Sequence, residues 1–237
     1  MSTQPSDEDS VSLAEQNLLM FATIGLPLAR MIHSGTIDPE TVSRDELAKA
    51  LKALGNTHED AFEIYLTQIE EEMPLVAHCV SSGRPRSGVV ILFTLIEAEV
   101  NSLIRFLLRI RGYSASRITD ALKGTSFDTK LDVLLPLLEV EVPERFRNVA
   151  LQCKSIRNVV VHNKATPALM ADIGNKDSDS ELANERSAKF FSENPIERLQ
   201  TDLKDFFDVS VSHDSAMQWS AQLFDKYFKS IGPEGDA

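Results

Sequence analysis

The sequence predicts an all-α protein, an up-and-down helical bundle preceded by an additional helical region. Apolar residues recur at helical spacing along most of the 237 residues, while the alternation that is typical of β-strands is hard to find. Glycine and proline are scarce, at ten residues each. Hydrophobic residues make up 43% of the chain and charged residues 25%, which is the usual balance of a globular domain.

Residues 12–83 are predicted to form an N-terminal helical extension, and the polar, acidic residues 1–11 before it are expected to be disordered. Apolar spacing and capping residues predict three helices in the extension, over 12–31 with a kink at Pro27, over 38–54 and over 58–80. The second begins at Asp38-Pro39-Glu40, where aspartate can cap the helix and proline fits its first turn. Ser81-Ser82-Gly83-Arg84-Pro85 breaks the pattern and sets the boundary of the extension.

Residues 84–231 are predicted to form the main bundle. The helices expected here are 87–111, 114–122, 126–138, 143–163, one that begins at Asn194, and 214–231. The first of these is apolar nearly all round, which predicts a central position. Residues 164–193 are polar and poorly patterned, so we expect a long loop with at most one short helix. Residues 232–237 are expected to be a disordered tail.

The basic residues are concentrated in two segments of an acidic chain. A net charge of −12 argues against nonspecific binding to a polyanion. Residues 84–130 nevertheless carry 8 basic and 4 acidic side chains, and residues 143–164 carry 5 basic and 1 acidic. The two segments either mark a basic binding region or are ordinary solvated helix faces.

Cysteine usage and apolar runs predict the compartment. Cys79 and Cys153 are too few for a disulfide scaffold and too far apart for a zinc site, so we expect two buried, reduced thiols. No His-Glu-x-x-His pattern or glycine-rich phosphate loop is found, so we expect neither a metal nor a cofactor. The acidic N-terminus is unlike a signal peptide, and the longest apolar run, 89–96, is too short to cross a bilayer. We therefore expect a cytoplasmic protein with no membrane partner.

The segment from Ser155 to His162 carries the strongest functional signal. Four residues separate Arg157 from His162, a spacing that chance can supply, so the context has to decide. Ile156-Arg157-Asn158-Val159-Val160-Val161-His162-Asn163 resembles the signature of the HEPN superfamily, an arginine, often followed by a polar residue, and then a histidine after a short spacer. The upstream helix with Glu97-Ala98-Glu99-Val100-Asn101 and the stretch 130–135 are similar to earlier parts of such domains. The resemblance covers residues 84–231.

The resemblance implies a metal-independent endoribonuclease in which two copies of the motif meet at the cleft of a homodimer. His162 would exchange a proton with a ribose 2′-hydroxyl or with the leaving 5′-oxygen, since its pKa lies near neutrality. Arg157 would bind the scissile phosphate. The products would be a cyclic phosphate and a 5′-hydroxyl. Because many such proteins are toxins or antiviral defence effectors, the expected partners are RNA, a second copy and an antitoxin or regulatory protein.

Helical geometry partly supports these roles. Asn158 and His162 share a helix face, so Asn158 can orient the imidazole. Arg157 and His162 lie about 140° apart around an ideal helix and about 7.5 Å apart along it. Either the arginine reaches toward the cleft or a dimer partner supplies the complementary group. Lys164 stands where some HEPN toxins carry a tyrosine, so regulation through that tyrosine is not expected here.

Five further residues are candidates for substrate binding: Lys164, Lys154, Arg105, Asn101 and Glu97. The last three form a polar stripe on the predicted central helix, because they recur every four residues and continue to Arg109. This stripe could line the cleft or form a ladder of intrahelical salt bridges.

A second function from another class fits the same residues. The overall acidity and the acidic N-terminal region favour a non-catalytic helical module that binds a protein partner or a nucleotide. In that case His162 complements the dipole at a helix C-terminus. An open basic cleft lined by Arg157 and His162 would favour the enzyme over the module.

Overall fold

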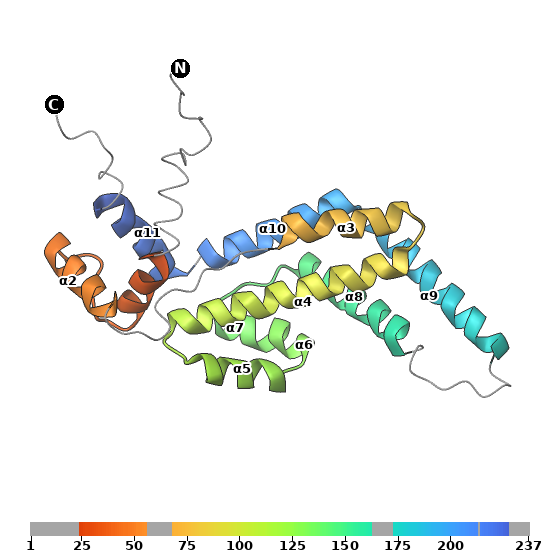
Figure 1. Ribbon diagram of the computed structural model, residues 1–237, viewed down its shortest axis with the longest axis horizontal. Helices are drawn as coiled ribbons and strands as arrows, with labels where there is room; N and C mark the ends of the chain where they lie inside the picture. The colour runs from red at the N-terminus through yellow and green to blue at the C-terminus, as the bar shows by residue number, and fades with distance from the viewer. Residues whose placement is uncertain (1–23, 56–67, 163–172, 213, 228–237) are drawn as a thin grey trace, which may run out of the picture. The chain divides into compact units, whose positions relative to one another are not determined.

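The computed structural model describes residues 24–55, 68–162, 173–212 and 214–227. It confirms the all-α fold, since the described residues contain no strand (Figure 1). Residues 24–33 are helical. The later elements are α2 (Arg44–Gly55), α3 (Ile69–Ser81), α4 (Pro85–Ile110), α5 (Ala115–Gly124), α6 (Phe127–Thr129), the π-helical turn η1 (Lys130–Leu134), α7 (Leu135–Leu137), α8 (Glu144–His162), α9 (Ile173–Glu193), α10 (Ile196–Ser212) and α11 (Ser215–Tyr227).

The chain divides into two compact units that are not contiguous in sequence. The small unit contains residues 24–33, α2, residues 108–114 (the end of α4 and the turn after it) and α11. The large unit contains α3, α4 up to residue 107, and α5 to α10. The sequence assigned α3 to an N-terminal extension. In the structure α3 belongs to the same unit as α4, whereas α2 belongs to the other unit.

The small unit has its own apolar core. Its buried members are Leu28, Met31, Ile37, Val42, Leu47 and Leu223. Tyr227 of α11 donates a hydrogen bond to the carbonyl of Val42 at 2.8 Å. Asp214 caps α11 by accepting from the backbone N–H groups of Ala216 and Met217 at 3.0 and 3.1 Å. The predicted start of the last helix is therefore confirmed.

The predicted start of α2 is wrong. Asp38 accepts from the Glu40 N–H at 3.0 Å and holds a turn, and the helix begins only at Arg44. Ser43 and Glu46 form a capping box there: the Ser43 N–H donates to Glu46 Oε2 at 2.9 Å, and the Glu46 N–H donates to Ser43 Oγ at 3.3 Å. The Ser43 hydroxyl also donates to Glu46 Oε2 at 2.6 Å, and the two hydrogen bonds from Ser43 to the Glu46 carboxyl lower its pKa.

The helix predicted over 58–80 does not run through Gln68. That residue is the N-cap of α3, with φ −97° and ψ 6°. Its N–H donates to Oε1 of Glu99 at 2.6 Å, and Glu99 is a buried carboxylate on α4. A charged acceptor on a neighbouring helix therefore defines the start of α3. Residues 58–67 lie outside the described part.

Helix α4 occupies the central position that its apolar sequence predicts. Leu92, Ile96 and Leu103 are fully buried, and Gly112, with φ +81°, ends the helix as expected. By length and composition alone the helix could span a membrane, since an 18-residue window of it has a mean hydropathy of 1.6. The core helix of a bundle has the same properties, and 56% of this window is buried within the protein.

The helix predicted over 126–138 contains a π-helical turn. Ser126, the first residue of the predicted helix, is its N-cap, with Oγ accepting from the Thr129 N–H at 3.2 Å. The Leu135 N–H then reaches back to the carbonyl of Lys130, which widens the turn. Pro136 follows directly and has no N–H to donate, which explains why the regular pattern changes here.

The long loop predicted over 164–193 is wrong for residues 173–193, which form α9. The helix buries a narrow stripe of Ala183, Ser187, Phe190 and Phe191. The Ser187 hydroxyl donates to the Ala183 carbonyl at 2.7 Å, so this polar side chain is satisfied inside the helix. Half of the stripe consists of small residues, which explains its weak hydrophobic pattern. Residues 164–172, and the termini 1–11 and 232–237, lie outside the described part.

Candidate functional site

Helix α8 carries the segment that the sequence singles out, and one face of it packs on α4. Cys153 is buried on this face and directs its thiol toward the Val89 carbonyl at 3.6 Å. Burial strongly raises the pKa of the Cys153 thiol. The expected buried thiol is therefore confirmed for Cys153, while Cys79 on α3 is only half-buried; both are free.

Arg157 lies on the same side of α8 and stacks on an aromatic ring of α4. Its guanidinium carbon is 5.7 Å from the centroid of the Phe93 ring, a cation–π distance. Nη1 donates to Oδ1 of Asn158 at 3.3 Å, whereas Nε is buried and has no hydrogen-bond partner among the described residues. The ring of Phe93 is itself held edge-on by Phe127, with centroids 5.1 Å apart. An aromatic face and an amide therefore position this guanidinium.

The other basic residues of α8 are neutralised by carboxylates. The pairs are Arg145 with Asp202 at 2.5 Å, Arg147 with Asp132 at 2.6 Å and Lys154 with Asp128 at 2.6 Å. The second pair lowers the pKa of the Asp132 carboxyl. Within the described residues, no carboxylate lies within ion-pair distance of Arg157. Among the described basic residues of α8, Arg157 is therefore the one whose charge is not neutralised by a described carboxylate.

The structure describes the side chains of only some of the predicted site residues. His162 is the last residue of α8, and its side chain lies outside the described part, as does Lys164. The expected role of Asn158 in orienting His162 therefore stays a prediction, although Asn158 has a described partner in Arg157. Lys154, a candidate for substrate binding, is committed to Asp128.

The polar stripe of α4 forms no hydrogen bond or ion pair with Arg157, whose described partners are Asn158 and Phe93. Glu97, Asn101 and Arg105 are half-buried, and Oδ1 of Asn101 is buried with no described partner. Neither Glu97 nor Arg105 forms an ion pair with another described residue, so a salt-bridge ladder is not seen there. Arg109 belongs to the small unit, is buried, and donates to the Tyr113 carbonyl at 3.2 Å.

A groove of about 580 Å³ lies beside the stacked pair. We call it the Arg84 groove; its lining consists of Gly83, Arg84, Arg86, Ser87, Val90, Ile91, Val160 and Asn184. Val160 follows Arg157 by one helical turn and Val90 precedes Phe93 by one turn, so the groove adjoins the pair on both helices. Arg157 itself is not among the lining residues.

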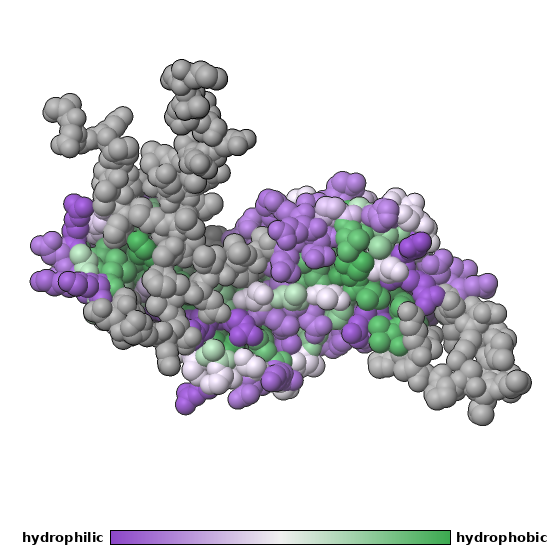
Figure 2. Space-filling view, in the orientation of Figure 1, coloured by the Kyte–Doolittle hydropathy of each residue, from purple (hydrophilic) through white to green (hydrophobic). Residues whose placement is uncertain are grey.

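On the face in Figure 2, hydrophobic surface (green) is exposed among hydrophilic residues (purple) where α3 meets α4.

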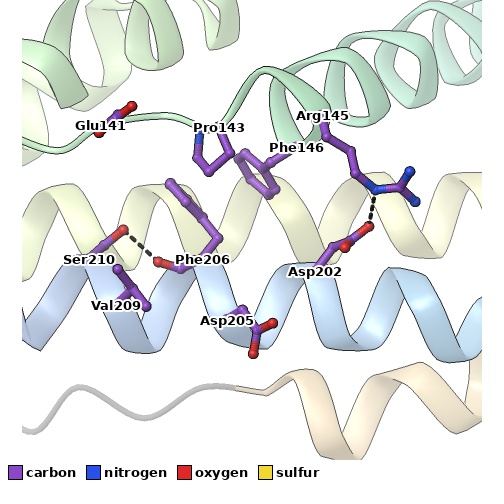
Figure 3. A pocket seen from close by; sticks show the side chains of 9 residues that line it. All are labelled: Glu141, Pro143, Arg145, Phe146, Asp202, Asp205, Phe206, Val209 and Ser210. Carbon is purple, nitrogen blue, oxygen red and sulfur yellow. Dashed lines mark hydrogen bonds and ion pairs between the residues drawn. The ribbon is translucent and has the colours of Figure 1, made fainter.

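Two other grooves of the large unit differ in charge. One of about 260 Å³ lies between the start of α8 and α10, where Phe146 and Phe206 stack and Arg145 is turned toward Asp202 (Figure 3). Glu141, Asp202 and Asp205 contribute carboxylates to it. The other, of about 420 Å³, is lined by Glu144 and Glu193 among others. The described residues contain no cluster of three metal-ligating side chains.

No family model, curated protein or solved structure matches the chain. The relation to HEPN domains therefore stays a resemblance carried by the segment 156–163 and by the order of the helices. Sequence reasoning missed Phe93 as a partner of Arg157. No local signal could have found it, because a phenylalanine on an apolar helix has the same pattern whether it packs in the core or supports a cation.

Proposed function

We propose that the chain is a metal-independent endoribonuclease of HEPN type. The observation that supports this most directly is the environment of Arg157. A half-buried guanidinium with no described carboxylate partner is unusual in a protein with a net charge of −12, since an unpaired charge is costly to bury. An anionic substrate would supply the missing partner.

The chemistry follows from the residue types. A histidine at position 162 takes the proton from the ribose 2′-hydroxyl, and the resulting oxygen attacks the adjacent phosphorus. The bond between phosphorus and the 5′-oxygen then breaks, and a second acid protonates that oxygen. The products are a 2′,3′-cyclic phosphate and a 5′-hydroxyl. Because one motif supplies one histidine, the proposal includes a homodimer in which the second copy supplies the acid.

Arg157 is suited to hold the phosphate during this reaction. A guanidinium can bind two phosphate oxygens with parallel hydrogen bonds, and these strengthen as negative charge grows. Nε of Arg157 has no described acceptor, and an unsatisfied buried donor costs about 1–3 kcal/mol. A phosphate oxygen that reaches Nε recovers this energy while Phe93 holds the plane of the guanidinium.

The runner-up is a helical module without catalysis. It is favoured by one specific observation: Arg157 is half-buried and does not line the Arg84 groove. In that case Arg157 serves packing between α8 and α4, and the module binds a protein or nucleotide elsewhere. A cytoplasmic location, a role as a toxin or antiviral effector, and an antitoxin partner belong to the enzyme proposal and stay predictions.

The experiment is RNA cleavage in EDTA by the full chain and by two histidine variants. His162→Ala removes the proposed base, and His78→Ala is the matched control, because His78 is an exposed histidine on α3. We expect cleavage by the wild type and by His78→Ala, and a loss of at least about a hundredfold in His162→Ala, as for removal of a general base. Absence of cleavage by the wild type, or equal cleavage by His162→Ala, would sink the enzyme and favour the module.

A further inference from the structure

The Arg84 groove differs from the other described grooves in the sign of its charge. Arg84 and Arg86 are the charged side chains among its described lining residues, which include no aspartate or glutamate. The two other grooves each contain carboxylates, three in one and two in the other. Within these grooves of an acidic protein, only the Arg84 groove is suited to a polyanion.

The chemistry of the lining fits a nucleic acid strand rather than a simple anion. Arginine side chains bind phosphate oxygens in a bidentate manner. The Ser87 hydroxyl and the Asn184 amide add hydrogen-bonding groups, while Val90 and Val160 supply apolar surface against which a ribose or a base can pack. The volume of about 580 Å³ lies within the usual range of small-molecule binding pockets, so the groove can hold part of a strand.

The position of the groove connects it with the proposed catalytic residues. Val160 is one turn from Arg157 on α8, and Val90 is one turn from Phe93 on α4. The groove therefore lies next to the turns of α4 and α8 that carry Phe93 and Arg157, although Arg157 is not among its lining residues. The terminal turn of α8, which ends at His162, begins at the groove.

We propose that the Arg84 groove binds the phosphodiester backbone of single-stranded RNA next to the bond that is cut. The position of the cut rests on the proposed function, whereas RNA binding in the groove does not. Arg84 and Arg86 each contact a phosphate, and the strand leads from them to Arg157. Neither arginine takes part in the chemical step.

The test measures the affinity of the full-length chain for a fluorescein-labelled oligoribonucleotide by fluorescence anisotropy in EDTA. All proteins carry His162→Ala, so that cleavage does not interfere. Arg84→Glu with Arg86→Glu is compared with Lys123→Glu and Arg198→Glu, which change the net charge equally at exposed positions outside the groove. Circular dichroism checks that each variant is folded, and Arg84→Ala with Arg86→Ala replaces the first pair if it is not.

We expect the groove pair to weaken RNA binding at least about tenfold and the control pair to change it less than about threefold. The salt dependence should fall by about 1.4 in the slope of log K against log salt, because each phosphate contact on a single strand contributes about 0.7. Unchanged binding by the groove variants, or an equal loss in the control pair, overturns the proposal. If wild-type RNA cleavage is absent but the groove pair alone loses binding, the nuclease fails and the groove stands. If cleavage depends on His162 but replacing both arginines does not change RNA binding, the nuclease proposal stands and the groove proposal fails.

Discussion

The guanidinium of Arg157 lies over the ring of Phe93, with 5.7 Å between its central carbon and the ring centroid. This contact joins α8 to α4 at the point where the sequence resembles a HEPN motif. Each of the other basic side chains of α8 that the structure describes forms an ion pair with a carboxylate. A ring positions a cation without neutralising it, which is the property that a phosphate-binding residue needs.

Replacement of Phe93 by leucine should therefore lower activity more than stability. A cation–π contact of this kind contributes about 0.5–2 kcal/mol, so we expect RNA cleavage to fall about tenfold as Arg157 loses its fixed orientation. Phe106→Leu is the matched control, because Phe106 is a buried phenylalanine on the same helix. Cleavage rates and thermal midpoints would be compared. An equal effect of both variants on cleavage would show that Phe93 acts only through core packing.

Gly88→Leu should destabilise the large unit. A Cβ at Gly88 would lie 3.2 Å from the ring of Phe191 and 3.3 Å from Val80, so a larger side chain has no room between α4, α9 and α3. We expect a loss of about 1–3 kcal/mol in the free energy of unfolding. Gly124→Leu is the control, since a Cβ there meets nothing within 4 Å. Chemical denaturation measures both, and equal stabilities would contradict the packing of α9 on α4.

The example of α9 shows where sequence patterns lose information. Helices with large apolar residues, such as α4 and α8, are predictable because burial selects Leu, Ile, Val and Phe at helical spacing. The stripe of α9 contains Ala183 and Ser187, which fit a close approach between helices and look the same as residues of a solvated segment. The start of α2 is mispredicted for a different reason. Ser43 and Glu46 have the sequence pattern of a capping box, but Asp38-Pro39 is a competing start signal a few residues earlier.

The candidate site was predictable in part for a related reason. Arg157, Asn158 and His162 are close in sequence, so a local motif identifies them. The contact of Arg157 with Phe93 spans two helices far apart in the chain, as does the pairing of Lys154 with Asp128. Such pairings depend on how the helices cross, which spacing along one helix does not determine.

The two thiols should differ in reactivity. Cys153 is fully buried and its pKa is raised, so little thiolate forms and a reagent has no access to it. Cys79 is half-buried and accessible to a reagent. Under native conditions a colorimetric disulfide reagent should therefore titrate one thiol quickly, and Cys79→Ser should abolish this phase. Both thiols should react in denaturant. Rapid native reaction of Cys153 in the Cys79→Ser variant would contradict its burial.

The ion pair of Arg147 with Asp132 should make a small part of the stability depend on pH. Because Arg147 lowers the pKa of Asp132 in the folded state, the pair stabilises the protein above the unfolded pKa of about 3.9. This contribution is lost as the pH falls through the lower folded value. Both side chains are about two-fifths exposed, so the effect is at most a fraction of a kcal/mol.

Thermal unfolding of Asp132→Asn measures this contribution. The difference in midpoint from the wild type should be present at pH 7 and should shrink below pH about 4. Asp120→Asn serves as the control, since Asp120 is exposed and forms no ion pair with another described residue. A difference that stays constant between pH 7 and pH 3 would mean that Asp132 stabilises the fold by another route.

The role of Arg157 as the phosphate-binding cation is tested most directly by the rate of RNA cleavage in EDTA when single arginines of α8 are removed. Arg157→Ala should lose at least about a hundredfold in rate while keeping its helical circular dichroism, as expected when an electrostatic stabiliser of the transition state is lost. Arg147→Ala, which removes an arginine of the same helix that is neutralised by Asp132, should cleave RNA at nearly the wild-type rate. Equal rates for the two variants, or no cleavage by the wild type, would contradict the account.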